Sequence, residues 1–336
     1  MQNTSPDPAA TAPLGPPPPF DPELAAALAV ITQMLPPGGS GADPGTTPPE
    51  DVPGMEPVTA EDLERDGAFR VEERSVPGPA DAPDVSLLIC RPSAPATPTP
   101  ALYHIHGGGM MVGDNRTGLP EMLDLAEELG LAVVSVEYRL APGTPYPGPV
   151  EDCYAGLRWT AEHAEELGVD PERIVVVGGS AGGGLAAAVA LLARDLGGPA
   201  LFGQLLMCPM LDDRNDTPSA RQMTGVGVWD RASNEAGWTA LLGAARGTDA
   251  VPPYAAPARA TDLSGLPPAF IDVGSAETFR DEDVDYATRL WQAGGAAELH
   301  VWPGAFHGFS GMAPHAAISH DARAARLLWL RRLLTN

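Results

Sequence analysis

The sequence predicts an α/β protein whose mostly parallel sheet is covered by helices on both faces. Two observations carry this prediction. Short apolar, β-branched stretches alternate with longer helical stretches through most of the chain, an alternation typical of βαβ units. The length of 336 residues suffices for one large α/β domain with appendages. In such a sheet, ligand sites lie at the carboxyl ends of the strands.

The N-terminal residues favour a tail followed by a helix. Residues 1–20 are mostly Pro, Ala, Thr and Gly, so we expect a disordered tail. Asp21 and Pro22 then begin a helix that runs to residue 35, with Asp as the cap and Pro at the first helical position.

A second short helix is expected beyond a Pro/Gly-rich linker over residues 36–58. Thr59 and Asp62 have the spacing of a capping box, which starts that helix. We assign residues 21–66 to an N-terminal helical cap segment and residues 67–336 to the main α/β domain.

Eight strands and four long helices account for most of the main domain. The expected strands cover residues 69–71, 85–90, 101–105, 131–138, 173–177, 201–208, 269–273 and 298–302. The expected helices cover residues 150–167, 181–196, 281–293 and 316–334. Residues 213–262 break the alternation between two strands, so we expect this insertion to contribute to the cap.

Composition argues against nucleic acid and membrane partners. The chain carries 44 acidic and 20 basic residues, a net charge of −24, which repels phosphate backbones and anionic lipid. No stretch approaches the 18 consecutive apolar residues of a membrane span. No basic residue precedes Arg65, so no secretory signal is expected and the predicted location is cytoplasmic. The three cysteines lack metal-type spacing.

A glycine block containing one serine follows the strand over residues 173–177. Gly178-x-Ser180-x-Gly182 in a strand–turn–helix setting fits a nucleophile elbow, in which the turn raises the serine hydroxyl above the sheet. Read alone, the same residues fit a Gly-rich connection without chemistry equally well. A dinucleotide loop is disfavoured because no G-x-G-x-x-G fits residues 178–184.

A second glycine run supports the catalytic interpretation. His106-Gly107-Gly108-Gly109 directly follows the strand over residues 101–105. Glycines there let backbone N–H groups approach a developing oxyanion. The two motifs together are far more specific than either one alone.

The chain resembles the bacterial hormone-sensitive-lipase-like esterases of the α/β-hydrolase fold. The matching stretches are His104-Ile-His-Gly-Gly-Gly109, Tyr138-Arg-Leu-Ala-Pro142, Asp170-Pro-Glu-Arg-Ile174, Gly178-Gly-Ser-Ala-Gly-Gly183 and Phe306-His-Gly-Phe309. They occur in the family's order over residues 70–310. The resemblance implies an α/β-hydrolase catalytic domain over residues 67–336, with an eight-stranded, mostly parallel sheet and a helical cap.

The resemblance assigns a catalytic triad. Ser180 is the nucleophile, and His307, in a short loop after the last strand, is the base. The acid must lie between them in this fold. Glu277 occupies the slot where family members usually carry aspartate, and a glutamate carboxylate can orient the imidazole equally well. Asp281 is the alternative, although its place at a helix start also suits a cap.

Further roles follow from the resemblance. The oxyanion hole is expected from the backbone N–H groups of Gly108, Gly109 and Ala181. From their positions in the chain, Met110 and Met111 on the oxyanion loop are candidate pocket residues, with a core role as an equal alternative. Trp229 and Trp238 in the insertion are hydrophobic anchors by default and candidate pocket residues second. No metal or other cofactor is expected, since the acidic run over residues 212–216 lacks the Gly and distal Glu of a calcium loop.

The expected function is that of a serine carboxylesterase acting on a small-molecule ester. The resemblance implies acyl chains of up to about eight carbons and an acyl-enzyme intermediate. An amidase, a lactonase or another hydrolase of the same fold is the main alternative, followed by a non-catalytic ligand receptor. Family members are often dimers, which leaves a homodimer open, and the sequence carries no interface signature.

Overall fold

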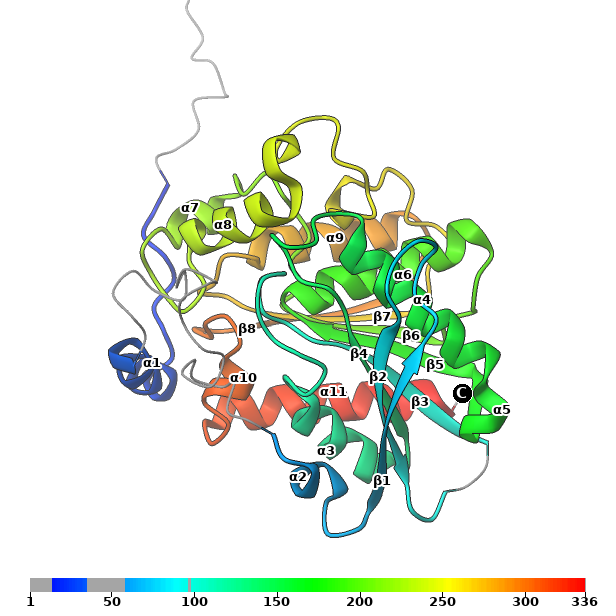
Figure 1. The fold of residues 1–336 in the computed structure, drawn as a ribbon. Coiled ribbons are helices and arrows are strands. Elements are labelled where there is room, and N and C mark those ends of the chain that lie inside the picture. The colour runs from blue at the N-terminus through cyan, green and yellow to red at the C-terminus, as the bar shows by residue number, and fades with distance from the viewer. Residues whose placement is uncertain (1–13, 35–57, 96–97, 336) are drawn as a thin grey trace, which may run out of the picture.

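A single eight-stranded sheet forms the centre of the molecule (Figure 1). The computed structural model describes residues 14–34, 58–95 and 98–335. The strand order is β1-β2-β4-β3-β5-β6-β7-β8, and β2 alone runs against its neighbours. The strands are β1 (Phe69–Val76), β2 (Val85–Pro92), β3 (Thr99–Ile105), β4 (Ala132–Glu137), β5 (Val169–Gly179), β6 (Gly203–Met207), β7 (Ala269–Gly274) and β8 (Ala297–Trp302). The predicted fold class is confirmed, and each strand overlaps its expected range.

Helices cover both faces of the sheet (Figure 1). One face carries α4 (Gly148–Glu162), α6 (Ala181–Leu196) and α9 (Arg280–Gln292), and the other carries α3 (Leu119–Leu129) and α11 (Ala317–Thr335). Every residue of β6 and β7 is buried. The sequence of a strand covered on both sides is a continuous apolar run, because neither face of the strand meets water.

Two helices differ from the expected pattern. The stretch predicted as one helix over residues 150–167 divides at His163 into α4 and the short α5 (Ala164–Leu167). Helix α3 was not anticipated. Its buried residues Leu119, Met122, Leu123 and Ala126 recur at helical spacing, so a periodicity count would have found it.

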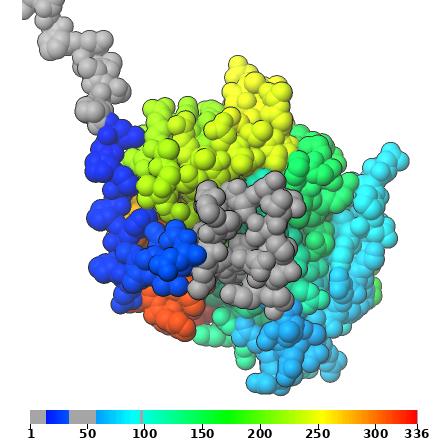
Figure 2. Space-filling view, turned by 60° about the vertical axis from the view of Figure 1, so that its left-hand side comes forward, coloured from blue at the N-terminus to red at the C-terminus, as the bar shows by residue number. Residues whose placement is uncertain are grey.

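Helix α1 (Pro22–Met34) lies against the segment around α10 (Phe309–Met312), as Figures 1 and 2 show. Asp21 Oδ1 accepts hydrogen bonds from the backbone N–H groups of Glu23 at 2.9 Å and Leu24 at 3.2 Å. The predicted role of Asp21 as the N-cap residue of this helix is therefore confirmed. The apolar face of α1 joins one cluster with the loop that precedes α10. That cluster includes Leu24, Leu28, Ile31, Phe306 and Phe309.

The predicted disordered tail over residues 1–20 is wrong at its C-terminal end. Residues 1–13 lie outside the described part of the chain, whereas residues 14–20 lie along the surface without regular structure. The Phe20 ring packs on Phe306, and the side chain of Gln222 donates to the carbonyl groups of Gly15 and Pro16. One aromatic contact and two hydrogen bonds hold a segment whose composition alone predicts disorder.

Helix α2 (Ala60–Glu64) does not join the cap, so the predicted cap segment over residues 21–66 is corrected. Its capping box is present, with Thr59 and Asp62 bonded reciprocally. However, α2 contacts β1 and α3, and Leu63 is buried in the apolar cluster on that face of the sheet. The linker predicted over residues 36–58 lies almost wholly outside the described residues.

The insertion over residues 213–262 folds into short helices above the sheet (Figure 1). Asp213, with no exposed surface, pairs with Arg259 at 2.5 Å, and Asp212 pairs with Arg214 at 2.7 Å. The Asp213–Arg259 pair connects the two ends of the insertion. Its elements are α7 (Pro218–Gln222), α8 (Arg231–Leu242) and the 3-10 turns η2 (Gly243–Ala245) and η3 (Pro257–Arg259). Across the described ranges, no helix has both the length and the apolarity needed to cross a bilayer.

Candidate active site

Ser180 occupies a strained turn between β5 and α6. Its backbone has φ 55° and ψ −123°, a conformation that residues other than glycine rarely adopt. A Cβ built at Gly178 would lie 2.3 Å from the carbonyl oxygen of Gly182, so only glycine permits this turn. The Ser180 side chain therefore stands at the carboxyl edge of the sheet, as the elbow motif predicts.

The sheet register brings the two glycine motifs together. Ile105, the last residue of β3, pairs with Gly178 of β5. The loop that follows Ile105 thus leaves the sheet beside the Ser180 turn. A Cβ built at Gly107 would lie 3.6 Å from the Ser180 Cβ, which places this loop in direct contact with the serine.

His307 connects Ser180 to a buried carboxylate. Its Nε2 lies 2.9 Å from Ser180 Oγ, and its Nδ1 lies 3.0 Å from Glu277 Oε1. The carboxylate can only accept, so Nδ1 carries the proton and Nε2 is free to accept from the serine hydroxyl. The side chains of His307 and Glu277 are 8% and 1% exposed. This tautomer is the one that a general base requires.

Glu277, not Asp281, contacts the histidine. Register pairs Gly274 of β7 with Trp302 of β8, so the loops that follow these strands leave the sheet together. Glu277 Oε2 also accepts a hydrogen bond from the Gly274 N–H at 3.0 Å, which fixes its carboxylate. Asp281 instead accepts from the Ser219 N–H at 2.7 Å, in the first turn of α9.

The loop after β3 is built around left-handed backbone. Gly108 and Gly109 have φ values of 116° and 61°. No described group accepts a hydrogen bond from either N–H, and the Ala181 N–H at the first position of α6 has no intrahelical partner. Gly108 and Gly109 lie on the loop that contacts Ser180, and Ala181 directly follows the serine at the start of α6.

His104 and His106 support this loop. His104 Nδ1 lies 2.8 Å from Ser135 Oγ, and His106 stacks on Tyr138 with ring centroids 4.1 Å apart. Burial lowers the pKa of His104 to about 3 and that of His106 to about 4. Both rings are therefore neutral at ordinary pH and shape the loop without supplying charge.

Trp229 lies near two parts of the candidate site, the His307 ring and Gly109. Its ring centroid is 6.3 Å from that of His307, and a Cβ built at Gly109 would lie 2.3 Å from its Cη2 atom. All three of Met110, Trp229 and Trp238 belong to the main core cluster, but Met110 and Trp238 are at most 1% exposed and Trp229 is 9% exposed. For Met110 and Trp238 the predicted pocket role is therefore corrected to the alternative core role. Met111 is partly buried and packs on that core.

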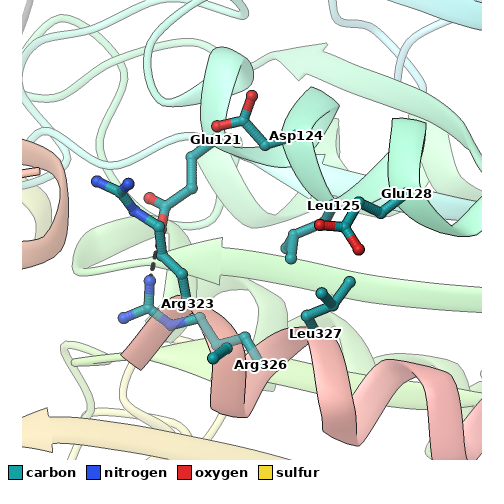
Figure 3. Close-up of a pocket in the computed structure, with 8 residues that line it drawn as sticks. Glu121, Asp124, Leu125, Glu128, Arg323, Arg326 and Leu327 are labelled. Carbon is teal, nitrogen blue, oxygen red and sulfur yellow. Dashed lines mark hydrogen bonds and ion pairs between the residues drawn. The ribbon is translucent and has the colours of Figure 1, made fainter. Parts of the chain in front are cut away.

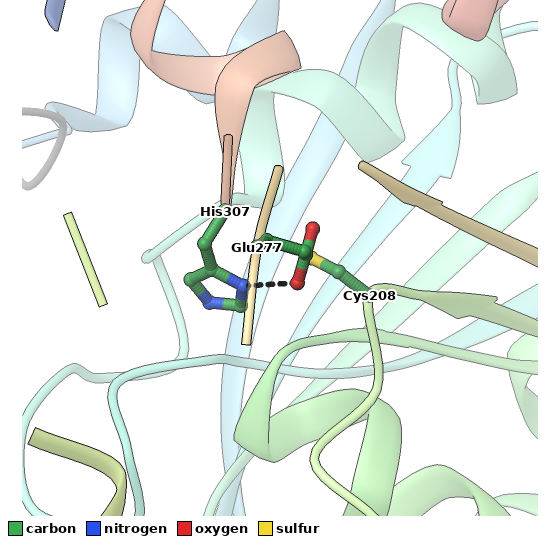
Figure 4. A group of neighbouring side chains, drawn as sticks. All are labelled: Cys208, Glu277 and His307. Atoms are coloured by element: carbon green, nitrogen blue, oxygen red, sulfur yellow. Dashed lines mark hydrogen bonds and ion pairs between the residues drawn. The ribbon is translucent and has the colours of Figure 1, made fainter. Parts of the chain in front are cut away.

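Three acidic or thiol groups behind the triad were not anticipated. Cys208 follows β6 and lies beside Glu277 and His307 (Figure 4). Burial, together with the nearby charges of Glu277, Asp272 and Asp283, raises its pKa well above the usual thiol value. Burial likewise raises the pKa of Glu282 and of Asp283 well above ordinary carboxyl values. No sequence signal separates Glu282 and Asp283 from ordinary acids of a first helical turn, and none marks Cys208.

A cavity of about 240 Å³ lies elsewhere, between α3 and α11 (Figure 3). Its charged side chains are paired within the protein. Arg326, 3% exposed, lies 2.6 Å from Glu121 and 2.8 Å from Asp272. Ser180 is not among the lining residues, so this cavity belongs to helix packing and is separate from the candidate active site.

The eight-stranded sheet and the strained serine turn define the architecture as an α/β-hydrolase fold. A family model described as the alpha/beta hydrolase fold matches residues 102–311. The carboxylesterase NlhH of Mycobacterium tuberculosis is 38% identical over 271 residues, which cover 79% of this chain and 83% of that protein. The ethyl acetate hydrolase of Pseudomonas putida is 32% identical over 272 residues, covering 74% and 84%.

Solved structures of esterases also match this chain. A bacterial heroin esterase matches with a TM-score of 0.83 and 42% identity, over 94% of this chain and 98% of its own. Esterase LipW from Mycobacterium marinum matches with a TM-score of 0.75 and 32% identity, over 94% and 92%. The chain belongs to the hormone-sensitive-lipase-like family of α/β-hydrolases.

Proposed function

We propose that this chain, an ester hydrolase by family, cleaves short-chain carboxylic esters through a Ser180–His307–Glu277 triad. The observation that carries the proposal is the unbroken hydrogen-bonded chain from Ser180 Oγ through the His307 ring to Glu277, with distances of 2.9 and 3.0 Å. A serine hydroxyl is unreactive at neutral pH unless a base stands next to it, and here one does.

In the acylation step, Ser180 Oγ attacks the ester carbonyl carbon while His307 Nε2 takes the hydroxyl proton. Glu277 stabilises the imidazolium that forms. When the tetrahedral intermediate collapses, the bond to the alcohol oxygen breaks, and His307 returns its proton to that oxygen. The products of this step are the free alcohol and an ester of Ser180.

Deacylation repeats the chemistry with water as the nucleophile. His307 takes a proton from the water that attacks the acyl-enzyme, and then returns it to Ser180 Oγ as the carboxylic acid departs. In both steps negative charge develops on the carbonyl oxygen. The N–H groups of Gly108, Gly109 and Ala181 are the donors for this oxyanion, because they flank Ser180 and have no competing acceptor among the described residues.

A short acyl chain, of up to about eight carbons, is the proposed specificity, because bulky side chains close the site on one side. Trp229 is only 9% exposed and lies against Gly109, so its indole limits the depth beside the oxyanion donors. Relatives named ethyl acetate hydrolase and acetyl-hydrolase also favour a small acyl group. Helix α1 and the 213–262 insertion would form the cap above it.

A series of p-nitrophenyl esters tests this proposal. The specificity constant should be high for acetate to hexanoate and should fall beyond octanoate, while a matched anilide and a lactone should be cleaved much more slowly. Faster cleavage of the anilide or lactone would reassign the enzyme to amidase or lactonase chemistry. Binding of esters without turnover would favour a receptor instead.

A further inference from the structure

A thiol lies directly behind the catalytic pair. Cys208 Sγ, a Glu277 carboxylate oxygen and a ring nitrogen of His307 all lie within 4.8 Å of one another (Figure 4). Cys208 follows the last residue of β6, with a left-handed φ of 38° that turns its side chain off the strand path. Ester hydrolysis by the triad gives this thiol no role.

Two buried acidic side chains near this thiol have carboxyl oxygens without a hydrogen-bond partner among the described residues. Asp283 has no exposed surface, both of its carboxylate oxygens lack a hydrogen-bond partner, and it interacts electrostatically with Cys208 and Glu277. Glu282 Oε2 also lacks a partner. Across the described residues, no arginine pairs with Glu277, Glu282 or Asp283. Buried polar groups ordinarily have a hydrogen-bond partner, so these oxygens leave acceptor capacity unused near the thiol.

We propose that Cys208, Glu277 and His307 form an inhibitory site for a thiophilic divalent cation such as cadmium or zinc. Sulfur, imidazole nitrogen and carboxylate oxygen are the three donor types that these ions take in proteins. The ion would be a visitor that stops the reaction, and not a resident cofactor. The binding part stands on the geometry alone, while the inhibition part rests on the proposed function.

The size of the group suits such an ion. Zinc bonds of about 2.0–2.3 Å place the ligands of a tetrahedral site roughly 3.3–3.8 Å apart. The three donor atoms lie within 4.8 Å of one another, so side-chain shifts of about 1 Å would close them around the ion. A fourth position on the ion would remain for water.

Inhibition follows from the histidine tautomer. In the free enzyme Nδ1 carries the proton and Nε2 accepts from Ser180. An ion bound at Nδ1 uses the lone pair of that nitrogen, so the single ring proton moves from Nδ1 to Nε2, where it faces the serine. Nε2 then has no lone pair to accept the Ser180 proton. The thiol proton of Cys208 is released to solvent as the thiolate binds.

Binding is tested on the Ser180→Ala protein, whose metal affinity does not depend on catalysis. Titration with cadmium chloride should produce the ultraviolet charge-transfer band of a cadmium–thiolate bond with saturable behaviour. Both Cys208→Ala and Cys208→Ser should remove the band. The second substitution keeps the test valid if the first variant does not fold. Cys90→Ala, at a fully buried cysteine in a separate cluster, should keep it. No band, or a band that survives loss of Cys208, overturns the site.

Inhibition is tested on the wild-type chain as a ratio to each protein's own metal-free rate. Cadmium should abolish ester hydrolysis, and EDTA should restore it. Cys208→Ala should raise the inhibitory concentration by at least about tenfold, the loss seen when even an outer partner of a metal site is removed, whereas Cys90→Ala should not. Cadmium binding without inhibition would overturn the inhibitory role, and an inactive wild type would instead refute the proposed function.

Discussion

The carboxylate of Glu277 lies 3.0 Å from His307 Nδ1 and is held there by the N–H of Gly274. Asp281, four residues further on, is bonded to the Ser219 N–H and to Arg280. The turn after β7 therefore separates two carboxylates that are near neighbours in the sequence. One faces the histidine, and the other starts a helix.

We expect Glu277→Gln to lower kcat by roughly 10⁴-fold, because the amide no longer favours the Nδ1–H tautomer or stabilises the imidazolium. Asp281→Asn is the matched control and should stay within about tenfold of wild type, since it removes only a helix-start contact. Steady-state hydrolysis of p-nitrophenyl butyrate gives both values. A near-normal Glu277→Gln, or the larger loss in Asp281→Asn, would contradict the assignment.

Gly109→Ala should lower kcat/KM by about 10²-fold, because the new Cβ would displace Trp229 and the oxyanion loop. That Cβ would lie 2.3 Å from the Trp229 ring. Gly130→Ala is the control, because Gly130 has a similar φ of 68° and no atom within 4 Å of a built Cβ. It should lose about 1 kcal/mol of stability and little activity. Equal activity in the two variants would argue against a role for the Gly109 N–H.

Trp229→Ala should extend the range of acyl chains. Removing the indole opens space beside Gly109, so we expect the octanoate-to-acetate ratio of kcat/KM to rise by about tenfold or more. Trp291→Ala removes an indole that is 47% exposed on α9 and should leave the ratio unchanged. An unaltered ratio in Trp229→Ala would mean that another group sets the limit.

Asp283 should make the fold less stable as the pH rises. Burial raises its pKa in the folded protein, so above its ordinary value of 3.8 the unfolded chain loses a proton that the folded chain keeps. That difference favours unfolding increasingly with pH. Asp283→Asn removes the effect, so its stability relative to wild type should improve above about pH 4, by at most about 1.4 kcal/mol per pH unit.

Urea denaturation of wild type and Asp283→Asn between about pH 4.5 and 8 measures this slope. The unpaired Asn amide adds a cost that does not vary with pH, so the slope is the relevant quantity. Asp249→Asn, at an exposed aspartate, is the control, and its stability relative to wild type should not change with pH. A difference that stays constant or shrinks with rising pH would mean that Asp283 is ionised in the folded protein.

The sheet was predictable because short apolar strands, among them the valine-rich β4 and β5, alternate along the chain with longer helical stretches. Helix α6 was predictable to the residue, since the glycine block sets its start and Gly197 its end. Helix α2 was predicted from its capping box, but its packing partner was not. A local motif fixes where a helix begins, whereas the burial of Leu63 against α3 depends on the tertiary fold.

Some residues of the candidate site could likewise be predicted from the sequence and others could not. Ser180, His307 and the glycine loop carry local motifs, and the strand register brings them together. Met110 and Trp238 have no such signal. The sequence near a site does not distinguish an apolar side chain that faces a substrate from one that faces the core. Cys208 and Asp283 become neighbours of Glu277 only through folding, so sequence reasoning passed over them.

The central claim is that Ser180 is the nucleophile, and active-site titration with a fluorophosphonate beside ester hydrolysis tests it most directly. Wild type should bind one label per chain and lose all activity. Ser180→Ala should bind none and hydrolyse p-nitrophenyl butyrate slower by about 10⁴-fold or more, whereas Ser264→Ala, at an exposed serine, should behave as wild type. Labelling or near-normal turnover in Ser180→Ala would contradict the claim.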